Sequence, residues 1–388
     1  MENMEVSDII DRAEDSKIQL KQDISNAVQL ASEMVAFSNA RGGVIIIGVS
    51  KTKDITGLSD KDIERINQLI SNASDQNVRP PIAPFTEVIK IGEKKVIALE
   101  VGEGINKPYS TNEGIFWTKK GSDKRKLSRE ELQRLFQDSS RMYADEQIVR
   151  GSSVRDIYRS FFEEFYENDY KERIEDSELP LERLLENIKL AEKFELRLGG
   201  LLLFGRNPQV FKPAFHVKAV SFYGDEPEGT EFRDSEDIKG NLSRQYKDTL
   251  GFLLRNIKKI QKGTQFNQQG ELEIPRQATE ELLVNALIHR DYYINAPIIV
   301  FIFDNRIEIS SPGRLPNNLT VEHIKKGISV VRNPILHSFG SRMLPYRGVG
   351  TGIRRAIKIY PNIEFENNEE PERFKVIIRR QAFRAENA

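Results

Sequence analysis

The sequence predicts a multidomain α/β (α+β) protein. Its 388 residues suffice for two or three domains at roughly 100–200 residues per domain. Hydrophobic residues make up 38% of the chain, which is enough for more than one core. Segments with helical spacing alternate with short apolar runs of the kind that form buried strands. We therefore expect three parts, residues 1–140, 141–265 and 266–388.

The first part, residues 1–140, is expected to combine helices with buried strands. Apolar residues at helical spacing predict a helix over 27–40, and Gly42 and Gly43 tolerate the positive φ angles that end a helix. The β-branched run over 44–49 is typical of a buried strand. The other elements expected here are a helix over 60–73, strands over 85–91, 95–101 and 114–119, and a helix opened by a capping box of Ser128 and Glu131.

The second part, residues 141–265, is expected to be a helical and α/β connector. The stretch 224–240 is rich in acidic residues, glycine and proline, which predicts a loop. The expected helices cover 153–166, 181–194 and 238–260, and the expected strands cover 200–204 and 215–222.

The third part, residues 266–388, begins with a helix that Pro275 starts. After the hairpin that follows this helix, Ser311, Pro312 and Gly313 break the second strand. A glycine-rich loop opens the last helix. In order, the expected elements are a helix over 276–290, strands over 297–303 and 306–310, a helix over 349–360 and a strand over 374–379.

Charge and composition exclude several classes of protein. The net charge of −1 provides no overall cationic field for nucleic acid or an anionic membrane. The absence of cysteine excludes disulfides, thiolate zinc sites and cysteine nucleophiles. The first fifteen residues are acidic and polar, unlike a signal peptide, and no stretch approaches 18 apolar residues. We expect a cytoplasmic protein with no membrane segment.

The helix over 276–290 carries a polar face. Glu281, Asn285 and His289 are spaced four residues apart, so they share one side of the helix. An amide oxygen is a suitable ligand for Mg²⁺, and a carboxylate one turn earlier can deprotonate an attacking water. By itself, this spacing also fits a solvated polar stripe.

A glycine-rich loop follows about sixty residues later. Gly348, Gly350 and Gly352 lead into a helix, and such loops let the backbone N–H groups approach phosphate closely. Positive charge for the phosphate would come from Arg347, Arg354 or Arg355. Taken alone, three alternating glycines also fit a simple turn.

The order of these elements resembles the GHKL or Bergerat ATP-binding family over about 270–385. The strings His289-Arg290-Asp291-Tyr292 and Arg306-Ile307-Glu308-Ile309-Ser310-Ser311-Pro312-Gly313-Arg314-Leu315-Pro316 resemble, more closely, the ATPase-like domain that follows a Schlafen-type domain in bacterial regulators. The resemblance implies ATP and Mg²⁺ as cofactors, Glu281 as the catalytic base, Asn285 as the Mg²⁺ ligand and residues 315–347 as a lid. The ATP-binding residues it implies are Asn285, His289, Ser311, Gly313, Arg347, Gly348, Gly350, Thr351 and Gly352.

One departure from the family concerns adenine. The family places an aspartate after the second strand, where its carboxylate accepts the adenine amino group, and this chain has Ser311, Pro312 and Gly313 there. A hydroxyl accepts the same bond without charge. We therefore expect weaker adenine recognition and, if ATP is hydrolysed at all, a slow Mg²⁺-dependent ATPase.

The first part resembles the Schlafen AlbA-like domain over about 10–137. The string Phe37-Ser38-Asn39-Ala40-Arg41-Gly42-Gly43 before a buried strand carries this resemblance, together with Lys107-Pro108-Tyr109 and Phe116-Trp117-Thr118. From the residues alone, a tight turn beside an apolar core is the alternative. Some Schlafen proteins cut transfer RNA or single-stranded DNA with three carboxylates, and only Glu14 matches that set here.

A basic run near the end of the first part is a candidate nucleic-acid surface. Lysine and arginine contact phosphates, and bases stack on aromatic rings. The alternative is a solvated loop with the aromatic residue in the core. The candidate residues are Trp117, Lys119, Lys120, Lys124, Arg125 and Lys126.

Together, these features predict an ATP-binding regulatory protein whose nucleotide state controls a nucleic-acid- or partner-binding N-terminal module. The resemblance implies a role in transcription regulation or antiviral defence against phage, and a homodimer. One alternative is a metal-dependent nuclease on RNA or single-stranded DNA that uses Glu14, although Gln19 and Ser50 stand at the other two carboxylate positions. The other is an interaction protein with a vestigial ATP site.

Overall fold

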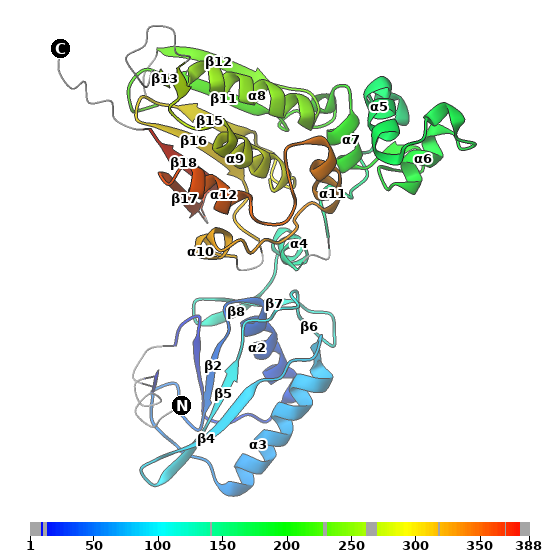
Figure 1. Cartoon of the computed structure of the whole chain (residues 1–388). Helices are drawn as coiled ribbons and strands as arrows, with labels where there is room; N and C mark the ends of the chain where they lie inside the picture. The colour runs from blue at the N-terminus through cyan, green and yellow to red at the C-terminus, as the bar shows by residue number, and fades with distance from the viewer. Residues whose placement is uncertain are drawn as a thin grey trace, which may run out of the picture. The chain divides into compact units, whose positions relative to one another are not determined.

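The computed structural model of the chain describes residues 9–10, 14–139, 142–227, 231–260, 270–316, 319–368 and 370–380. The chain divides into two compact units, Met1–Met142 and Tyr143–Ala388. Both units combine helices with sheets, which confirms the predicted mixed α/β class (Figure 1).

The first unit is built on a four-stranded sheet with the strand order β1-β2-β5-β4. Strand β1 is parallel to β2, and the other neighbours are antiparallel. The elements are β1 (Ile18–Lys21), α2 (Ala27–Asn39), β2 (Gly43–Ile47), α3 (Asp60–Asn72), β3 (Val78–Arg79), β4 (Phe85–Ile91), β5 (Lys94–Val101), β6 (Ser110–Thr111), β7 (Trp117–Lys120), β8 (Asp123–Lys126) and α4 (Arg129–Asp138).

Both faces of β2 are buried, which explains its continuous apolar sequence. Ile45 and Ile47 pack in one core with α2 and α3, whereas Ile46 packs in a second core on the opposite face of the sheet. A strand covered on both faces needs apolar side chains at every position, not at alternate ones. The predicted buried strand is therefore confirmed.

The sequence around Asn39 serves to join α2 to two distant segments. The Asn39 amide donates to the backbone carbonyls of Tyr109 and Trp117, at 2.8 and 2.9 Å, and accepts from the Tyr109 N–H at 2.7 Å. Gly42 has φ +70°, and a Cβ there would lie 2.7 Å from the Glu103 nitrogen. This part of the Schlafen-like motif thus maintains the fold of the first unit.

The second unit is built on a six-stranded mixed sheet with the order β12-β11-β15-β16-β18-β17. Helices α8, α9 and α12 cover one face of the sheet (Figure 1). The elements are α5 (Arg159–Tyr170), α6 (Leu181–Asn187), β9 (Ala191–Glu192), β10 (Glu195–Leu196), α7 (Leu198–Phe204), β11 (Val217–Phe222), β12 (Phe232–Ile238), α8 (Leu242–Asn256), β13 (Lys259–Ile260), β14 (Glu271–Leu272), α9 (Arg276–Ile288), β15 (Ile298–Ile302), β16 (Arg306–Pro312), α10 (Val321–Lys325), α11 (Pro334–Met343), α12 (Gly352–Ile359), β17 (Ile363–Asn368) and β18 (Arg373–Arg379).

The large sheet crosses the boundary that we expected near residue 265. Strand β11, from the expected connector, pairs in parallel with β15, which lies beyond that boundary. One core also includes side chains from both sides of it, among them Phe204, Leu253, Leu283 and Ile307. The second unit therefore includes segments from both sides of the expected boundary.

Three predicted elements of this unit are wrong. The strand expected over 200–204 is helix α7, because every one of its residues is buried and periodicity cannot separate such a helix from a buried strand. The loop expected over 224–240 contains β12, an edge strand whose charged side chains suit an exposed edge. The helix expected over 181–194 ends at Asn187, and the hairpin β9–β10 follows it.

The structure also adds elements to the segment expected as a lid. Helices α10 and α11 lie within residues 315–347, and β17 completes the edge of the sheet beside β18.

No helix in the described parts of the chain has the length and apolar character needed to cross a membrane.

Candidate nucleotide-binding site

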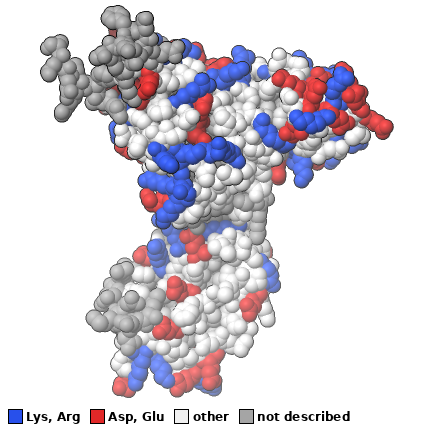
Figure 2. Space-filling model, viewed as in Figure 1, with Lys and Arg blue, Asp and Glu red and all other residues white. Residues whose placement is uncertain are grey.

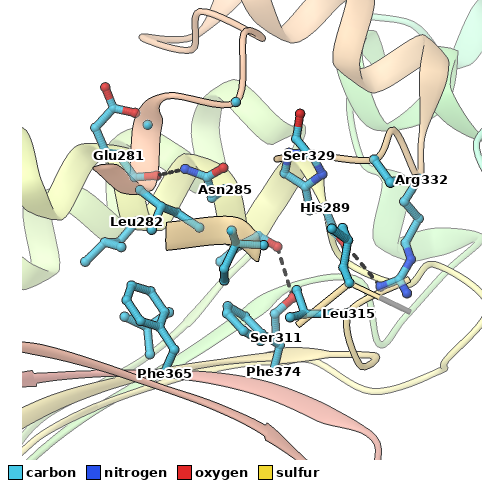
Figure 3. A pocket seen from close by; sticks show the side chains of 18 of the residues that line it. Glu281, Leu282, Asn285, His289, Ser311, Leu315, Ser329, Arg332, Phe365 and Phe374 are labelled. Carbon is cyan, nitrogen blue, oxygen red and sulfur yellow. Dashed lines mark hydrogen bonds between the residues drawn. The ribbon is translucent and has the colours of Figure 1, made fainter. Parts of the chain in front are cut away.

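A recess in the second unit brings the two predicted halves of the C-terminal site together. Helix α9 forms one wall, the glycine loop and the start of α12 form another, and strands β16, β17 and β18 form the floor (Figure 3). The cavity in this recess measures about 100 Å³. Ligand pockets commonly measure about 300–1,000 Å³, so a nucleotide fits only if the cavity widens.

The polar face of α9 points into this recess. Glu281, Asn285 and His289 line it, while Leu283 and Leu287 between them are fully buried. The Asn285 amide nitrogen donates to the Glu281 backbone carbonyl. Its Oδ1 is then the side-chain atom left to contact a cation, and an amide oxygen is a suitable Mg²⁺ ligand.

The carboxylate of Glu281 is held by an arginine from the facing helix. Arg355 Nε donates to Glu281 Oε1 at 2.9 Å, and Arg355 Nη2 contacts the same oxygen. Arg355 Nη1 also donates to Thr351 Oγ1 at 3.2 Å, which fixes the guanidinium against the first turn of α12. Of the three arginines considered from sequence, Arg347 and Arg355 line the recess.

Gly352 lies directly against the polar face of α9. A Cβ at this position would lie 2.5 Å from Glu281 Oε2 and 3.2 Å from Asn285 Nδ2. Only glycine allows the start of α12 to approach the carboxylate this closely. Gly348, Gly350 and Thr351 line the same side of the recess.

His289 stands at the far end of the polar face. Its Nε2 lies 2.9 Å from the Tyr346 hydroxyl oxygen. Burial lowers the pKa of His289 to about 4, with smaller contributions from His337 and Arg332, so the ring is neutral at pH 7. Burial also raises the pKa of the Tyr346 hydroxyl to about 12. Neither group therefore contributes charge to the recess near neutral pH.

Ser311 occupies the position where the resemblance implies an adenine contact. Its hydroxyl donates to the Ala286 backbone carbonyl at 3.1 Å, and the residue is 6% exposed. The hydroxyl hydrogen is thus committed to α9, and only the oxygen lone pairs remain for a ligand. Gly313 follows at the end of the strand and also lines the recess.

The apolar floor of the recess was not predicted from sequence. Phe365 of β17 and Phe374 of β18 stack with their ring centroids 6.0 Å apart, and Figure 3 shows them across the recess from the polar residues of α9. The alternation of Ile363 and Phe365 with acidic residues is a period-two signal for a half-buried strand, and it could have revealed β17.

Arg332 was also missed. It lines the recess from the lid segment and donates to the backbone carbonyls of His289, at 3.3 Å, and Arg314, at 2.6 Å. The sequence placed it in an expected loop, where nothing distinguished it from other arginines.

Positive charge gathers beside the recess. Lys325 and Lys326 at the end of α10 and Lys358 on α12 are exposed, and Figure 2 shows basic side chains grouped over these two helices. One of them, Lys325, pairs with Glu322 at 3.3 Å. A cationic surface at the mouth of a cleft raises the local concentration of anionic ligands.

The basic run of the first unit is more occupied by internal contacts than the sequence suggested. Lys119 is 9% exposed and donates to the Ser122 carbonyl at 2.8 Å, and burial lowers its pKa. Lys124 pairs with the buried Glu33 at 3.1 Å.

Arg125 of the same run pairs with Glu131, the third residue of α4, whose side chain completes the capping box with Ser128. Lys120 and Lys126 are exposed, and the Lys126 ammonium lies 5.9 Å from the centre of the half-buried Trp117 ring. Of the six candidates, Lys119 and Lys124 are the most withdrawn from solvent, whereas Arg125, although ion-paired, keeps a side chain that is 40% exposed.

The positions compared with Schlafen nucleases do not assemble carboxylates. Glu14 accepts from the Leu20 N–H at 2.9 Å, and Gln19 is 8% exposed and lies 3.5 Å from the Lys119 ammonium. Ser50 forms a hydrogen-bonded loop with Asp54. Among the residues that the structure describes, no three His, Asp or Glu side chains come together as a group that could hold a metal ion.

Comparisons with known proteins agree with this architecture. Residues 14–128 match the family model described as "Schlafen, AlbA_2", and residues 295–378 match the model described as "Putative ATP-dependent DNA helicase recG C-terminal". Both resemblances inferred from the sequence are therefore confirmed. The second match covers the glycine loop and begins after α9, so it does not include Glu281 or Asn285.

Solved structures include similar chains. The crystal structure of the DIP2311 protein from Corynebacterium diphtheriae is 20% identical, with a TM-score of 0.49 over 97% of this chain and 80% of that chain. The solution structure of the N-terminal domain of a "Putative ATP-dependent DNA Helicase RecG-related Protein" from Nitrosomonas europaea is 20% identical, with a TM-score of 0.23 over 31% of this chain and 93% of that chain. No curated protein matches the chain.

Proposed function

We propose that this chain, which combines a Schlafen AlbA-like domain with a C-terminal GHKL ATPase-like domain, is an ATP-binding regulatory protein. One observation carries the proposal. An acid and an amide on one face of α9 meet, in a single recess, a glycine loop that lies about sixty residues further along the chain. A solvated polar stripe or a simple turn would not require these two segments to meet.

Each part of the recess suits one part of a nucleotide. Asn285 would bind Mg²⁺ through its amide oxygen, and the free N–H groups at the start of α12 would bind phosphate. The stacked rings of Phe365 and Phe374 form an apolar floor against which a base would pack. Lys325, Lys326 and Lys358 would attract the polyphosphate from solution.

Glu281 would be the water-activating base of a slow ATPase. Its carboxylate lies within contact of the residues that would hold the phosphates, as that role requires. Because Arg355 holds the same carboxylate, hydrolysis would need this contact to change. Ser311 offers only an uncharged acceptor, so adenine would bind less tightly than in relatives that use aspartate.

We propose further that the nucleotide state controls binding of nucleic acid, or of another partner, by the N-terminal domain. Lys120 and Lys126 are exposed candidate residues beside the half-buried Trp117, and the name of the second matched family refers to a DNA helicase. A lid that orders over bound nucleotide is a common way to couple two such events. Transcription regulation and phage defence are processes that such a protein would serve.

Calorimetric titration with ATP tests the binding proposal. Asn285→Ala should weaken ATP binding at least about tenfold in Mg²⁺, or about 1.4 kcal/mol, and much less when EDTA replaces Mg²⁺. Gln277→Ala is the matched control, because Gln277 is exposed on the same helix and does not line the recess. Equal ATP affinity of wild type and Asn285→Ala in Mg²⁺ would contradict the assignment.

A further inference from the structure

The carboxylate of Glu281 lies where a phosphate of a bound nucleotide would be expected. It sits against Gly352 at the start of α12, and it is the oxyanion that the Arg355 guanidinium contacts. Both the start of a helix and an arginine fork are general binding groups for oxyanions, whether carboxylate or phosphate. The Glu281 side chain thus occupies a position suited to an anion.

This arrangement also accounts for the narrowness of the cavity. Glu281 and Arg355 come from opposite walls of the recess, and their side chains are 13% and 29% exposed. The contact between them therefore spans the gap in which the polyphosphate would lie. Widening the cavity of about 100 Å³ at this point requires the contact to part.

Arg355 can change partners because a second hydrogen bond, to Thr351, holds its guanidinium independently of Glu281. Its Nη1 bond to Thr351 Oγ1 keeps the guanidinium at the first turn of α12 when the carboxylate leaves. Arg354 is different, because it does not line the recess and its Cδ lies beside Gly327.

We propose that Glu281 competes with nucleotide phosphate for Arg355, and that the Glu281–Arg355 pair holds the phosphate position closed in the empty protein. On binding, the guanidinium passes from the carboxylate to a phosphate oxygen. Glu281 is then released beside Asn285, where it can contact water. This inference rests on the proposed ATP site and adds a regulatory contact to it.

The proposal predicts that a change at Glu281 strengthens binding. Glu281→Gln removes the competing charge while keeping the size of the side chain, so ATP affinity should rise about fivefold, the equivalent of about 1 kcal/mol for a partly buried ion pair. Arg355→Ala should lower ATP affinity by a similar factor, and Arg355→Lys should fall between the two. If Glu281 only contacted the ligand and did not compete with it, Glu281→Gln would not raise ATP affinity.

The experiment is a double-mutant cycle measured by calorimetry with Mg²⁺. Wild type, Glu281→Gln, Arg355→Ala and the double variant are each titrated with ATP, ADP and adenosine. Glu281→Gln should have no effect on ATP affinity in the Arg355→Ala background, because the competitor matters only while Arg355 is present. Adenosine affinity should stay the same in all four proteins, and the comparison of ATP with ADP identifies which phosphate Arg355 contacts.

Two matched controls separate the contact from general charge. Glu280→Gln alters the neighbouring glutamate, which pairs with Arg276 at 2.7 Å outside the recess. Arg354→Ala removes one positive charge next to Arg355 without removing the contact. Both should change ATP affinity by less than about twofold.

The outcomes distinguish the two proposals. Folded Glu281→Gln that binds ATP equally or more weakly than wild type overturns the competition, while leaving the ATP site intact. An absence of nucleotide binding by every variant overturns the proposed function itself. Binding by Glu281→Gln alone, with none by wild type, supports the closed state directly.

Discussion

Asp145 is a buried carboxylate that should make stability depend on pH. It is 0% exposed, and its Oδ2 accepts from the Leu336 N–H, at the start of α11, at 2.9 Å, whereas Oδ1 has no hydrogen-bond partner. Burial raises the pKa of the Asp145 carboxyl from 3.8 to about 7. At neutral pH, the folded protein therefore bears the cost of a charged group with incomplete compensation.

The raised pKa of Asp145 determines whether stability rises or falls with pH. Between pH 3.8 and about 7, the folded protein retains a proton on Asp145 that the unfolded chain has lost, so stability decreases as pH rises through this window. A shift of about three units at about 1.36 kcal/mol each gives a maximum near 4 kcal/mol. Asp145→Asn keeps an acceptor for Leu336 and cannot ionise, so it should lose this dependence.

Urea unfolding of wild type and Asp145→Asn at several pH values from 5 to 8 measures the effect. The stability advantage of the variant should grow by roughly 2–4 kcal/mol between pH 5 and pH 8. Asp237→Asn, at an exposed position of β12, controls for the loss of one surface carboxylate. A difference between Asp145→Asn and wild type that is constant over this range would refute the reasoning.

Two further predictions concern buried contacts in the second unit. Glu273 and Arg380 form an ion pair at 2.6 Å, with side chains only 3% and 1% exposed. Glu273→Ala should therefore lower the free energy of unfolding, measured by urea denaturation, by roughly 3–5 kcal/mol. A loss below about 1 kcal/mol would contradict the importance of the pair. Gly352→Ala should reduce ATP affinity at least about tenfold, because its methyl group would fill the space at the start of α12 where a phosphate is expected to bind. The control Gly251→Ala lies in α8, where the methyl meets only Arg255 Nη1 at 3.8 Å, and it should raise stability by about 0.5–1 kcal/mol without affecting ATP.

Local patterns in the sequence were sufficient to predict the polar wall and the glycine loop. Helical spacing alone predicts that Glu281, Asn285 and His289 share one face. The position of Gly352 at the start of a helix predicts its place in the glycine loop. Their meeting in one recess depends on how α9 and α12 pack on the sheet, which the family resemblance supplied. The elements that were missed lack a distinctive period, such as the fully buried α7, or carry charge at an exposed edge, such as β12.

Contacts between side chains far apart in the chain could not be predicted from the sequence. Arg355 was one of three arginines near the glycine loop, and its pairing with Glu281 spans 74 residues of the chain. The basic run shows the same effect in the first unit. Lys119 and Lys124 looked like surface cations, but the fold commits them to Ser122 and Glu33.

The closed Glu281–Arg355 contact bears on how a weak affinity for ATP would be interpreted. When only a fraction of a protein is competent to bind, the apparent affinity falls by that fraction. A pair that favours the closed state by about 1 kcal/mol leaves roughly one molecule in six open, so a functional site would bind ATP about sixfold more weakly than its contacts allow. A vestigial site would also bind weakly, but removing the competing carboxylate would not improve it. The response of ATP affinity to Glu281→Gln therefore separates a site held closed by its own acid from one that has lost the ability to bind.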